Sequence, residues 1–141
     1  MNAINFDTGL VSYTINGKYE LTFNPTDSAF VQKLYAAFDS LDGKQEQYKA
    51  ETEAASNEPA KVFALAEKRD AEMRETVDGV LGAGASDAIF EGMNLYALAN
   101  GLPVWANLFL AIMDEIDTGF AKEQKATNPR IAKYQSRYGK R

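Results

Sequence analysis

Two amino acids are missing from the sequence: its 141 residues include no cysteine and no histidine. Without cysteine the chain forms no disulfide and offers no thiolate nucleophile. Without histidine it lacks the commonest metal ligand, the imidazole of Ser-His-Asp and Cys-His triads, and the usual general base near neutral pH. An enzyme made from this chain would depend on carboxylates, Lys, Tyr, Ser or Thr, and these show no catalytic arrangement. We therefore predict a protein that is not an enzyme and that binds no cofactor or metal.

Long apolar runs and targeting signals are also missing. No apolar run reaches the roughly 18 to 20 residues that span a bilayer, and the first residues, MNAINFDTG, lack the basic and apolar regions of a signal peptide. We expect a cytoplasmic protein that does not contact a membrane. The chain is 45% hydrophobic and 25% charged, as is ordinary for one globular domain. We expect this single α+β domain to cover residues 1–120.

The net charge of −5 is distributed unevenly along the chain. Residues 120–141 contain seven basic residues and one acidic residue, whereas residues 1–119 contain eight basic and nineteen acidic residues. We predict that residues 121–141 form a basic, partly flexible tail. The preferred interpretation is a soluble tail, followed by a protein-docking segment and then by nucleic-acid contacts that combine basic residues with Tyr134 and Tyr138. The acidic body and the lack of a reading motif argue against nucleic acid. The basic residues are Lys122, Lys125, Arg130, Lys133, Arg137, Lys140 and Arg141.

Residues 10–23 have the alternating pattern of a β-hairpin. A two-residue Asn16-Gly17 loop would pair Tyr13 with Glu20 and mix apolar and charged side chains on one face. A three-residue loop over residues 15–17 pairs Tyr13 with Tyr19 and unites the apolar side chains. We therefore predict a type I turn with Gly17 in the left-handed region. The apolar set is Val11, Tyr13, Ile15, Tyr19, Leu21 and Phe23, and the spacing of Ile4 and Phe6 predicts a short third strand.

Residues 24–120 are expected to be mainly helical, with about four helices. Asn24 is the predicted N-cap of the first helix, because Pro25 and Asp27 follow it in favourable positions. The polar segment 44–57 is compatible with a solvated continuation of that helix or with a mobile connection. The apolar stripe of the first helix consists of Phe30, Val31, Leu34, Tyr35, Phe38 and Leu41.

Three further helices are predicted after this segment. The first covers Pro59–Leu81, where interleaved acidic and basic residues indicate surface ion pairs. A short helix starts at Ser86-Asp87, contains Ile89, Phe90 and Met93, and continues through residues 95–98 to an end at residues 100–103. The most apolar helix runs from Val104 to about Phe120 and is the expected centre of the core. The interleaved charges are Glu67, Lys68, Arg69, Asp70, Arg74 and Glu75.

The joint at residues 77–92, VDGVLGAGASDAIFEG, is rich in small residues. Its run Gly-Ala-Gly-Ala-Ser superficially resembles a phosphate-binding loop. However, a helix precedes it instead of a strand, and no Lys stands at the P-loop position. We therefore predict that Gly82 is a helix C-cap, that Gly84 lies in a tight turn and that Ser86 is the next N-cap.

Two other groups of residues have a functional and a structural interpretation. The carboxylates of Asp114, Glu115 and Asp117 are more consistent with a solvated helix face than with a cation site, which needs several convergent oxygens. The aromatic side chains between residues 90 and 109 are most simply part of the core, and a partner-binding patch is the alternative. They are Phe90, Tyr96, Trp105 and Phe109.

Two stretches together resemble the phage tail assembly chaperones of prophages in Gram-positive bacteria. The first is INGKYELTFN followed by a helix, since a short hairpin opens many of these proteins. The second is the 77–92 joint, which is similar to their pattern of a helix ending in an apolar residue and Gly, then Gly-x-Ser, an acidic residue and an Ile-Phe pair. The resemblance spans most of residues 10–120, although the polar segment 44–57 is long for the family. The matching positions are Val77, Leu81, Gly82, Gly84, Ser86, Asp87, Ile89, Phe90 and Gly92.

The resemblance implies a non-enzymatic role in phage tail assembly. Such chaperones bind the long, helical tape-measure protein, keep it soluble and help recruit tail-tube subunits, and they are absent from the finished virion. A homo-oligomer is compatible with this role. Holding a helical client requires exposed apolar surface, and we predict this protein-binding surface at Ile89, Phe90, Met93 and Tyr96, because Met and aromatic side chains adapt to varied helices.

Two other functions remain open. A structural tail or head-tail connector subunit would be present in purified virions, where a chaperone would be missing. A small nucleic-acid-binding regulator acting through the basic tail would show salt-sensitive DNA binding that is lost when residues 128–141 are deleted.

Overall fold

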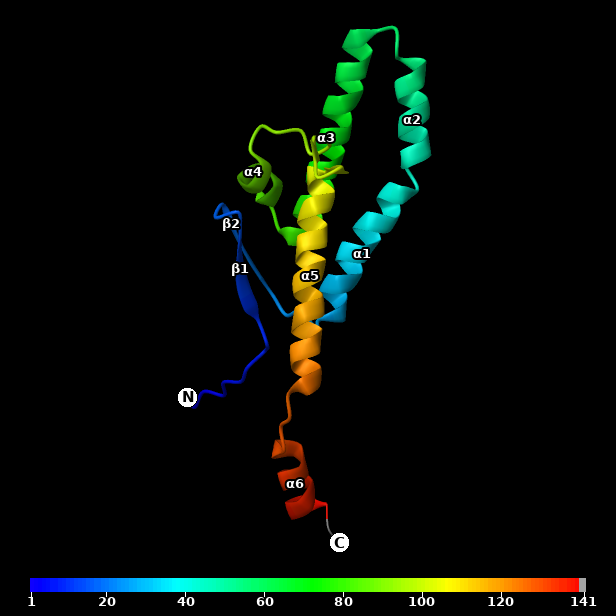
Figure 1. Cartoon of the computed structure of the whole chain (residues 1–141). Helices are drawn as coiled ribbons and strands as arrows, with labels where there is room; N and C mark the ends of the chain where they lie inside the picture. Colours follow the sequence, from blue (N-terminus) through cyan, green and yellow to red (C-terminus); the bar gives the residue numbers. More distant parts are fainter. Residues whose placement is uncertain (140–141) are drawn as a thin grey trace.

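The computed structural model describes residues 1–139, apart from the side chains of Leu41 and Asp42. The predicted stripe residue Leu41 and the tail residues Lys140 and Arg141 therefore lie outside the described residues. The fold is α+β, with an N-terminal hairpin beside an elongated set of helices (Figure 1). In chain order the elements of the described part are β1 (Val11–Ile15), β2 (Tyr19–Phe23), α1 (Ser28–Asp42), α2 (Gln45–Ala54), α3 (Pro59–Leu81), α4 (Ala85–Phe90), β3 (Leu98–Ala99), β4 (Leu102–Pro103), α5 (Val104–Lys125) and α6 (Arg130–Tyr138).

The hairpin confirms the predicted apolar face but differs from the predicted turn. Ile15 pairs with Tyr19, so the three-residue loop consists of residues 16–18 and the pairing of Tyr13 with Tyr19 is wrong. Asn16 and Gly17 both have positive φ, 51° and 69°, and the Lys18 amide donates to the Ile15 carbonyl oxygen at 2.9 Å. These features define a type I′ Asn-Gly turn. Lys18 is the extra residue that returns Tyr19 to the apolar face.

Helix α1 begins later than predicted, because Asp27 rather than Asn24 is its N-cap. The Asp27 carboxylate accepts the Ala29 amide at 3.0 Å, and its carbonyl oxygen accepts the Val31 amide at 3.1 Å. Asn24 instead closes a turn before the helix, where its side-chain oxygen accepts the Thr26 amide at 2.8 Å.

The apolar face of the hairpin packs against α1. The ring of Phe23 on β2 stacks on the ring of Phe30 on α1, with centroids 4.5 Å apart, and on the ring of Tyr13 at 5.2 Å. An isolated two-stranded hairpin is marginal in water. The helix that follows it in the sequence therefore supplies the cover it needs.

The polar segment after α1 forms a separate helix, α2, which runs beside the N-terminal half of α3 (Figure 1). Arg69 of α3 fixes it by donating to the Tyr48 carbonyl oxygen at 2.6 Å and to the Thr52 hydroxyl at 2.9 Å. The guanidinium also lies 4.5 Å from the centroid of the Tyr48 ring, within cation–π range. Contacts from a neighbouring helix thus order a segment that has little apolar surface of its own.

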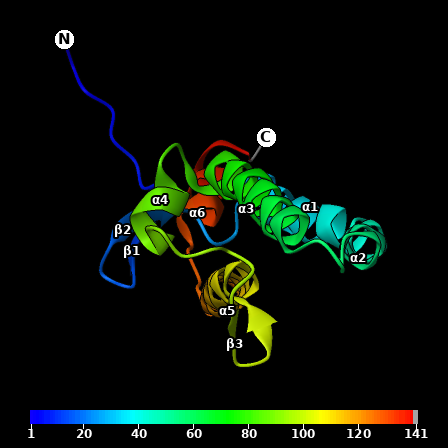
Figure 2. The same ribbon diagram turned by 90° about the horizontal axis from the view of Figure 1, so that it is seen from above.

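The core lies where α5 packs across the other elements. In the view of Figure 2, α4 and the hairpin lie on one side of α3 and α1 lies on the other, while α5 lies in the lower part of the picture. Residues of all these elements contribute to one core. Phe109 and Val77 are fully buried, and Trp105 contacts Phe38 and Phe109 at centroid distances of 5.8 and 5.9 Å. This confirms α5 as the centre of the core. Within residues 1–139, no helix is long and apolar enough to cross a membrane.

The predicted tail begins as the last turn of α5, which extends to Lys125. A second helix, α6, follows after Asn128-Pro129 and stands apart from the body (Figure 1). The predicted interruption at this proline is confirmed, since proline cannot continue the hydrogen-bond ladder. Every described residue from 121 onward is exposed. The described chain therefore has six helices where about four were expected, the additional ones being α2 and α6.

Candidate functional site

The joint between α3 and α4 uses two glycines in backbone conformations that suit glycine. Gly82 caps the C-terminus of α3 with a φ of 125°, and Gly84 precedes α4 with a φ of 81°. The Tyr19 hydroxyl of the hairpin donates to the Leu81 carbonyl oxygen at 3.1 Å. A Cβ atom at residue 82 would stand 2.9 Å from that hydroxyl. The predicted roles of both glycines are confirmed, and the joint also holds the hairpin.

Ser86 does not have its predicted role as an N-cap. Helix α4 begins at Ala85, so Ser86 is inside the first turn, where its side chain is completely buried. The Ser86 amide donates to a carboxylate oxygen of Asp78 on α3, at 2.8 Å. The Asp78 side chain on the preceding helix therefore satisfies a backbone N–H at the start of α4, a role that the sequence pattern assigned to the Ser86 side chain.

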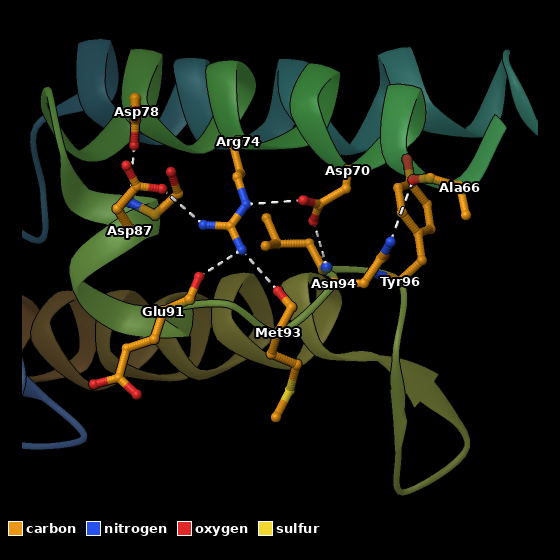
Figure 3. A network of polar contacts seen from close by, with 11 residues as sticks. Ala66, Asp70, Arg74, Asp78, Asp87, Glu91, Met93, Asn94 and Tyr96 are labelled. Atoms are coloured by element: carbon orange, nitrogen blue, oxygen red, sulfur yellow. Dashed lines mark hydrogen bonds and ion pairs between the residues drawn. The ribbon is translucent and has the colours of Figure 1, made fainter. Parts of the chain in front are cut away.

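Arg74 of α3 holds the segment that leaves α4 (Figure 3). Its guanidinium pairs with Asp70 at 3.0 Å and with Asp87 at 2.8 Å. The same group donates to the carbonyl oxygens of Glu91 and Met93, at 2.8 and 2.7 Å. Glu91 has a positive φ of 53°, a conformation that costs energy for a residue other than glycine and persists only when its surroundings fix it. Arg74 provides that fixation.

The same face of α3 orders the next residues of the chain. Asp70 accepts the Leu95 amide at 2.7 Å, and the Asn94 side chain donates to the Ala66 carbonyl oxygen at 3.2 Å (Figure 3). The predicted helical continuation over residues 95–98 is wrong. The chain forms irregular structure there and then a small hairpin, in which the Asn100-Gly101 turn connects β3 to β4.

The charged residues of α3 were expected to form surface ion pairs. Asp70 and Arg74 do pair, but their side chains are only 21% and 16% exposed, and both bind backbone groups of residues 91–95. Arg69 likewise binds α2. The pattern of alternating charge therefore predicts ion pairing correctly, but it does not predict that these side chains also hold neighbouring parts of the backbone.

The residues held by Arg74 form one wall of an apolar groove of about 620 Å³, which we call the α4–α5 groove. Residues of the hairpin turn and of α5 also line the groove. Lys18 of the turn pairs with Glu91 at 3.5 Å across the rim. Besides these two residues the groove is lined by Ile15, Asn16, Ile89, Phe90, Gly92, Met93, Ala99, Val104, Asn107, Leu108 and Ala111.

Three of the four predicted binding residues line this groove, and the fourth does not. Ile89 is buried among the core residues, Phe90 is half-buried, and Met93 is 53% exposed. Tyr96 lies instead in a second pocket of about 570 Å³, between α2 and the start of α5. The predicted surface is therefore not one continuous face.

The sequence contained only part of the signal for the remaining groove residues. Val104 and Leu108 belong to the apolar stripe of the last helix, which was interpreted as core. Ile15 and Lys18 come from the hairpin, and Ile15 lies 74 positions before Ile89 in the sequence. Nothing in a single sequence brings those two parts of the chain together.

Three aromatic rings are among the residues that line the second pocket. Tyr96 makes edge-to-face contacts with Tyr48 and Trp105, with centroids 6.3 Å apart in each pair. Burial is the main cause that raises the pKa of the Tyr96 phenol above its ordinary value of 10.0, and the neighbouring Tyr48 acts in the same direction. Trp105 and Phe109 are buried, which confirms the interpretation of these two aromatic residues as core.

The remaining charged candidates do not converge on a site. Asp114, Glu115 and Asp117 are exposed on α5, as expected for a solvated helix face. In the part of the chain that the structure describes, no three acidic side chains lie in an arrangement that could hold a metal ion. Comparison of the chain with protein-family models, with curated proteins and with solved structures finds no match.

Proposed function

We propose that this protein is a non-enzymatic assembly chaperone, which acts in the cytoplasm of a bacterial host and binds a helical client through the α4–α5 groove. By the sequence resemblance, the client is the tape-measure protein of a phage tail, and the complex helps recruit tail-tube subunits. The proposal combines that resemblance with one structural observation, the apolar groove itself.

The shape and composition of the α4–α5 groove support a protein client. The groove has a volume of about 620 Å³. Its lining is mainly apolar, with one cation and one anion paired at the rim. An amphipathic helix binds such a groove with side chains spaced three or four residues apart. Met93 at the rim can repack around different apolar side chains, because methionine is flexible and polarisable.

The groove is also preorganised for binding. Arg74 fixes the backbone at Glu91 and Met93, and the Tyr19 hydroxyl fixes the hairpin against the end of α3. A wall that is already ordered loses less conformational entropy when a client binds.

Co-purification with the tape-measure protein tests this function. The expected result is capture by the wild type and weakened capture by Met93→Glu, since a charge at this exposed rim position opposes burial of an apolar client. Phe63→Glu is the matched control, because Phe63 is an exposed apolar residue on α3 that does not line the groove. Equal capture by all three proteins would remove the groove from the proposal, and no capture by the wild type would overturn the chaperone function.

The presence or absence of the protein in purified particles distinguishes a structural tail or connector subunit from a chaperone. A chaperone is expected in infected or induced cells and missing from purified particles. Detection of the protein in particles by mass spectrometry, at a constant ratio to other tail proteins, would favour the structural alternative. A tape-measure gene immediately downstream and a major tail protein gene upstream would favour tail assembly in either form.

Helix α6 supports a second candidate, nucleic-acid binding. The rings of Tyr134 and Tyr138 stack with centroids 6.4 Å apart, and Lys133 and Arg137 lie 5.6 and 5.9 Å from the Tyr134 ring. Basic groups beside aromatic faces can contact phosphates and stack on bases. This candidate requires salt-sensitive DNA binding that disappears when residues 128–141 are deleted, and it is rejected if no binding occurs at low salt.

A further inference from the structure

The N-terminal arm, residues 1–6, carries apolar side chains that the described chain leaves uncovered. Ile4 is 92% exposed and Phe6 is 81% exposed. Their spacing predicts a third strand, but no strand forms there, and the arm runs outward from the body in both views (Figures 1 and 2). The predicted strand therefore lacks a partner within residues 1–139.

The base of the arm is fixed in a defined direction. The Asn24 side chain donates to the Thr8 carbonyl oxygen at 2.9 Å, and the Gly9 amide donates to the Asp7 carboxylate at 2.8 Å. Gly9 has a φ of 71°, and a Cβ atom there would stand 2.6 Å from the Asn24 side-chain nitrogen. These contacts direct the arm away from its own hairpin.

Strand β1 has an edge that matches the arm. It pairs with β2 on one side, and within the described residues no strand pairs with its other side. Its sequence, VSYTI, contains no charged residue and no proline, which are the features that usually prevent an exposed edge from pairing. Val11, Ser12 and Thr14 are all exposed. This edge can accept another strand.

We propose that the arm of each molecule adds a strand to the β1 edge of a second copy of this chain, in a reciprocal exchange. The lengths agree, because residues 2–6 match the five residues of β1. Ile4 and Phe6 are separated by the polar Asn5 and share one face of an extended strand, so one face of the added strand is apolar and lies beside the exposed Val11.

A second copy fits better than a client, because one chain supplies both the unpaired strand and the unpaired edge. A two-fold exchange satisfies both edges and covers both arms at once. Strand addition of this kind derives affinity from backbone hydrogen bonds and specificity from alternate side chains. The exchange does not depend on the proposed chaperone function, since it uses a different surface.

The mass of the full-length chain in solution tests the exchange. Light scattering after size exclusion is expected to give a dimer for the wild type and a monomer for Phe6→Asp, because a charge on the apolar face of the arm opposes its burial. Leu98→Asp is the control and is expected to remain dimeric, since Leu98 is an exposed apolar residue outside the arm and β1. A monomeric wild type, or a Phe6→Asp variant that stays dimeric, would overturn the proposal.

A cross-linking experiment identifies the contact itself, since the natural chain has no cysteine. Ile4→Cys and Val11→Cys chains of different length are co-expressed and treated with a short bis-maleimide. A cross-linked heterodimer is expected. The control pair, Ile4→Cys with Ile131→Cys, places the second thiol on exposed α6 and is expected to react much less. Equal yields from the two pairs would contradict pairing of the arm with β1.

Discussion

Gly119 of α5 and Pro25 of the turn before α1 are in direct contact, although 94 positions separate them in the sequence. A Cβ atom on residue 119 would overlap the Cβ atom of Pro25 and would stand 2.8 Å from its Cγ atom. Pro25 is itself buried and its ring is rigid. The close approach of α5 to the hairpin–α1 connection therefore depends on the missing side chain.

Gly119→Ala is expected to lower the free energy of unfolding by about 1–3 kcal/mol, the usual cost of overpacking. Gly79→Ala is the matched control, because Gly79 is a helical glycine with no atoms near its would-be Cβ. That change is expected to stabilise by about 0.5–1 kcal/mol through helix propensity. Urea unfolding followed by circular dichroism measures both, and equal effects would contradict the contact.

Tyr19→Phe is expected to destabilise the protein by about 0.5–1.5 kcal/mol, because the Leu81 carbonyl oxygen loses the hydroxyl that donates to it. Hydrogen exchange should increase at the hairpin more than in α3. Tyr35→Phe removes a hydroxyl from an exposed position and should have little effect. Identical stabilities of the two variants would mean that the Tyr19 hydroxyl does not hold the hairpin.

Arg74→Gln is expected to destabilise by about 1.5–3 kcal/mol, because charge-assisted hydrogen bonds to a part-buried guanidinium are lost. Amides of residues 91–95 should exchange faster with solvent. The control, Lys61→Gln, removes an exposed ion pair with Glu58 and should change stability by less than about 1 kcal/mol. Unchanged exchange at residues 91–95 would show that Arg74 does not order this wall of the α4–α5 groove.

The buried Tyr96 phenol predicts a loss of stability at alkaline pH. Burial raises its pKa above the ordinary value of 10.0, and Tyr48 and Glu72 act in the same direction while Arg69 opposes them. The folded state therefore holds this proton more tightly than the unfolded chain. Its contribution to stability is fully present below pH 10 and is lost as the pH rises from there through the folded-state pKa.

Tyr96→Phe tests this linkage. As the pH rises above about 10, the free energy of unfolding should decrease less steeply in the variant than in the wild type. Tyr35→Phe, in which an exposed phenol is removed, should retain the steep decrease. A wild type and Tyr96→Phe variant with parallel pH profiles would contradict the burial effect.

Residue spacing alone predicts the elements with strong periodicity. The apolar alternation in residues 10–23 gives the hairpin and its buried face, and the helical stripes give α3 with correct ends at Pro59 and Leu81. The predicted hairpin pairing differs from the observed one by two residues, since Tyr13 pairs with Leu21 instead of Tyr19, and this difference leaves the apolar face unchanged. A pattern of faces therefore does not distinguish a loop over residues 15–17 from a loop over residues 16–18.

Short apolar segments are ambiguous in the same way. Leu95 and Leu98 fit a helical continuation, whereas Asn100-Gly101 is a strong hairpin signal whose two residues both have positive φ, 54° and 79°. The hairpin prevails because Asp70 and Asn94 already fix the preceding backbone in a non-helical path. That outcome depends on contacts across 25 positions or more, which a local pattern does not contain.

The candidate site was likewise predictable from the sequence only in part. Ile89, Phe90 and Met93 are close in sequence and reach one groove, whereas Tyr96, only three positions further, lies in another pocket. Arg74 donates to the Met93 carbonyl oxygen, and the chain continues past this residue without helical structure. An arginine in a run of alternating charges has the same sequence signature whether it lies in solvent or holds a loop.

The position of Trp105 has a practical consequence for spectroscopy. It is the single tryptophan of the chain, and it lies in the core among Phe38, Tyr96 and Phe109. Its emission should therefore be blue-shifted in the folded protein and should report the loss of the central packing. The N-terminal arm and α6 contain no tryptophan, so their fraying leaves the emission unchanged while the circular dichroism of α6 decreases. Comparing the two signals during one titration separates the melting of α6 from that of the body.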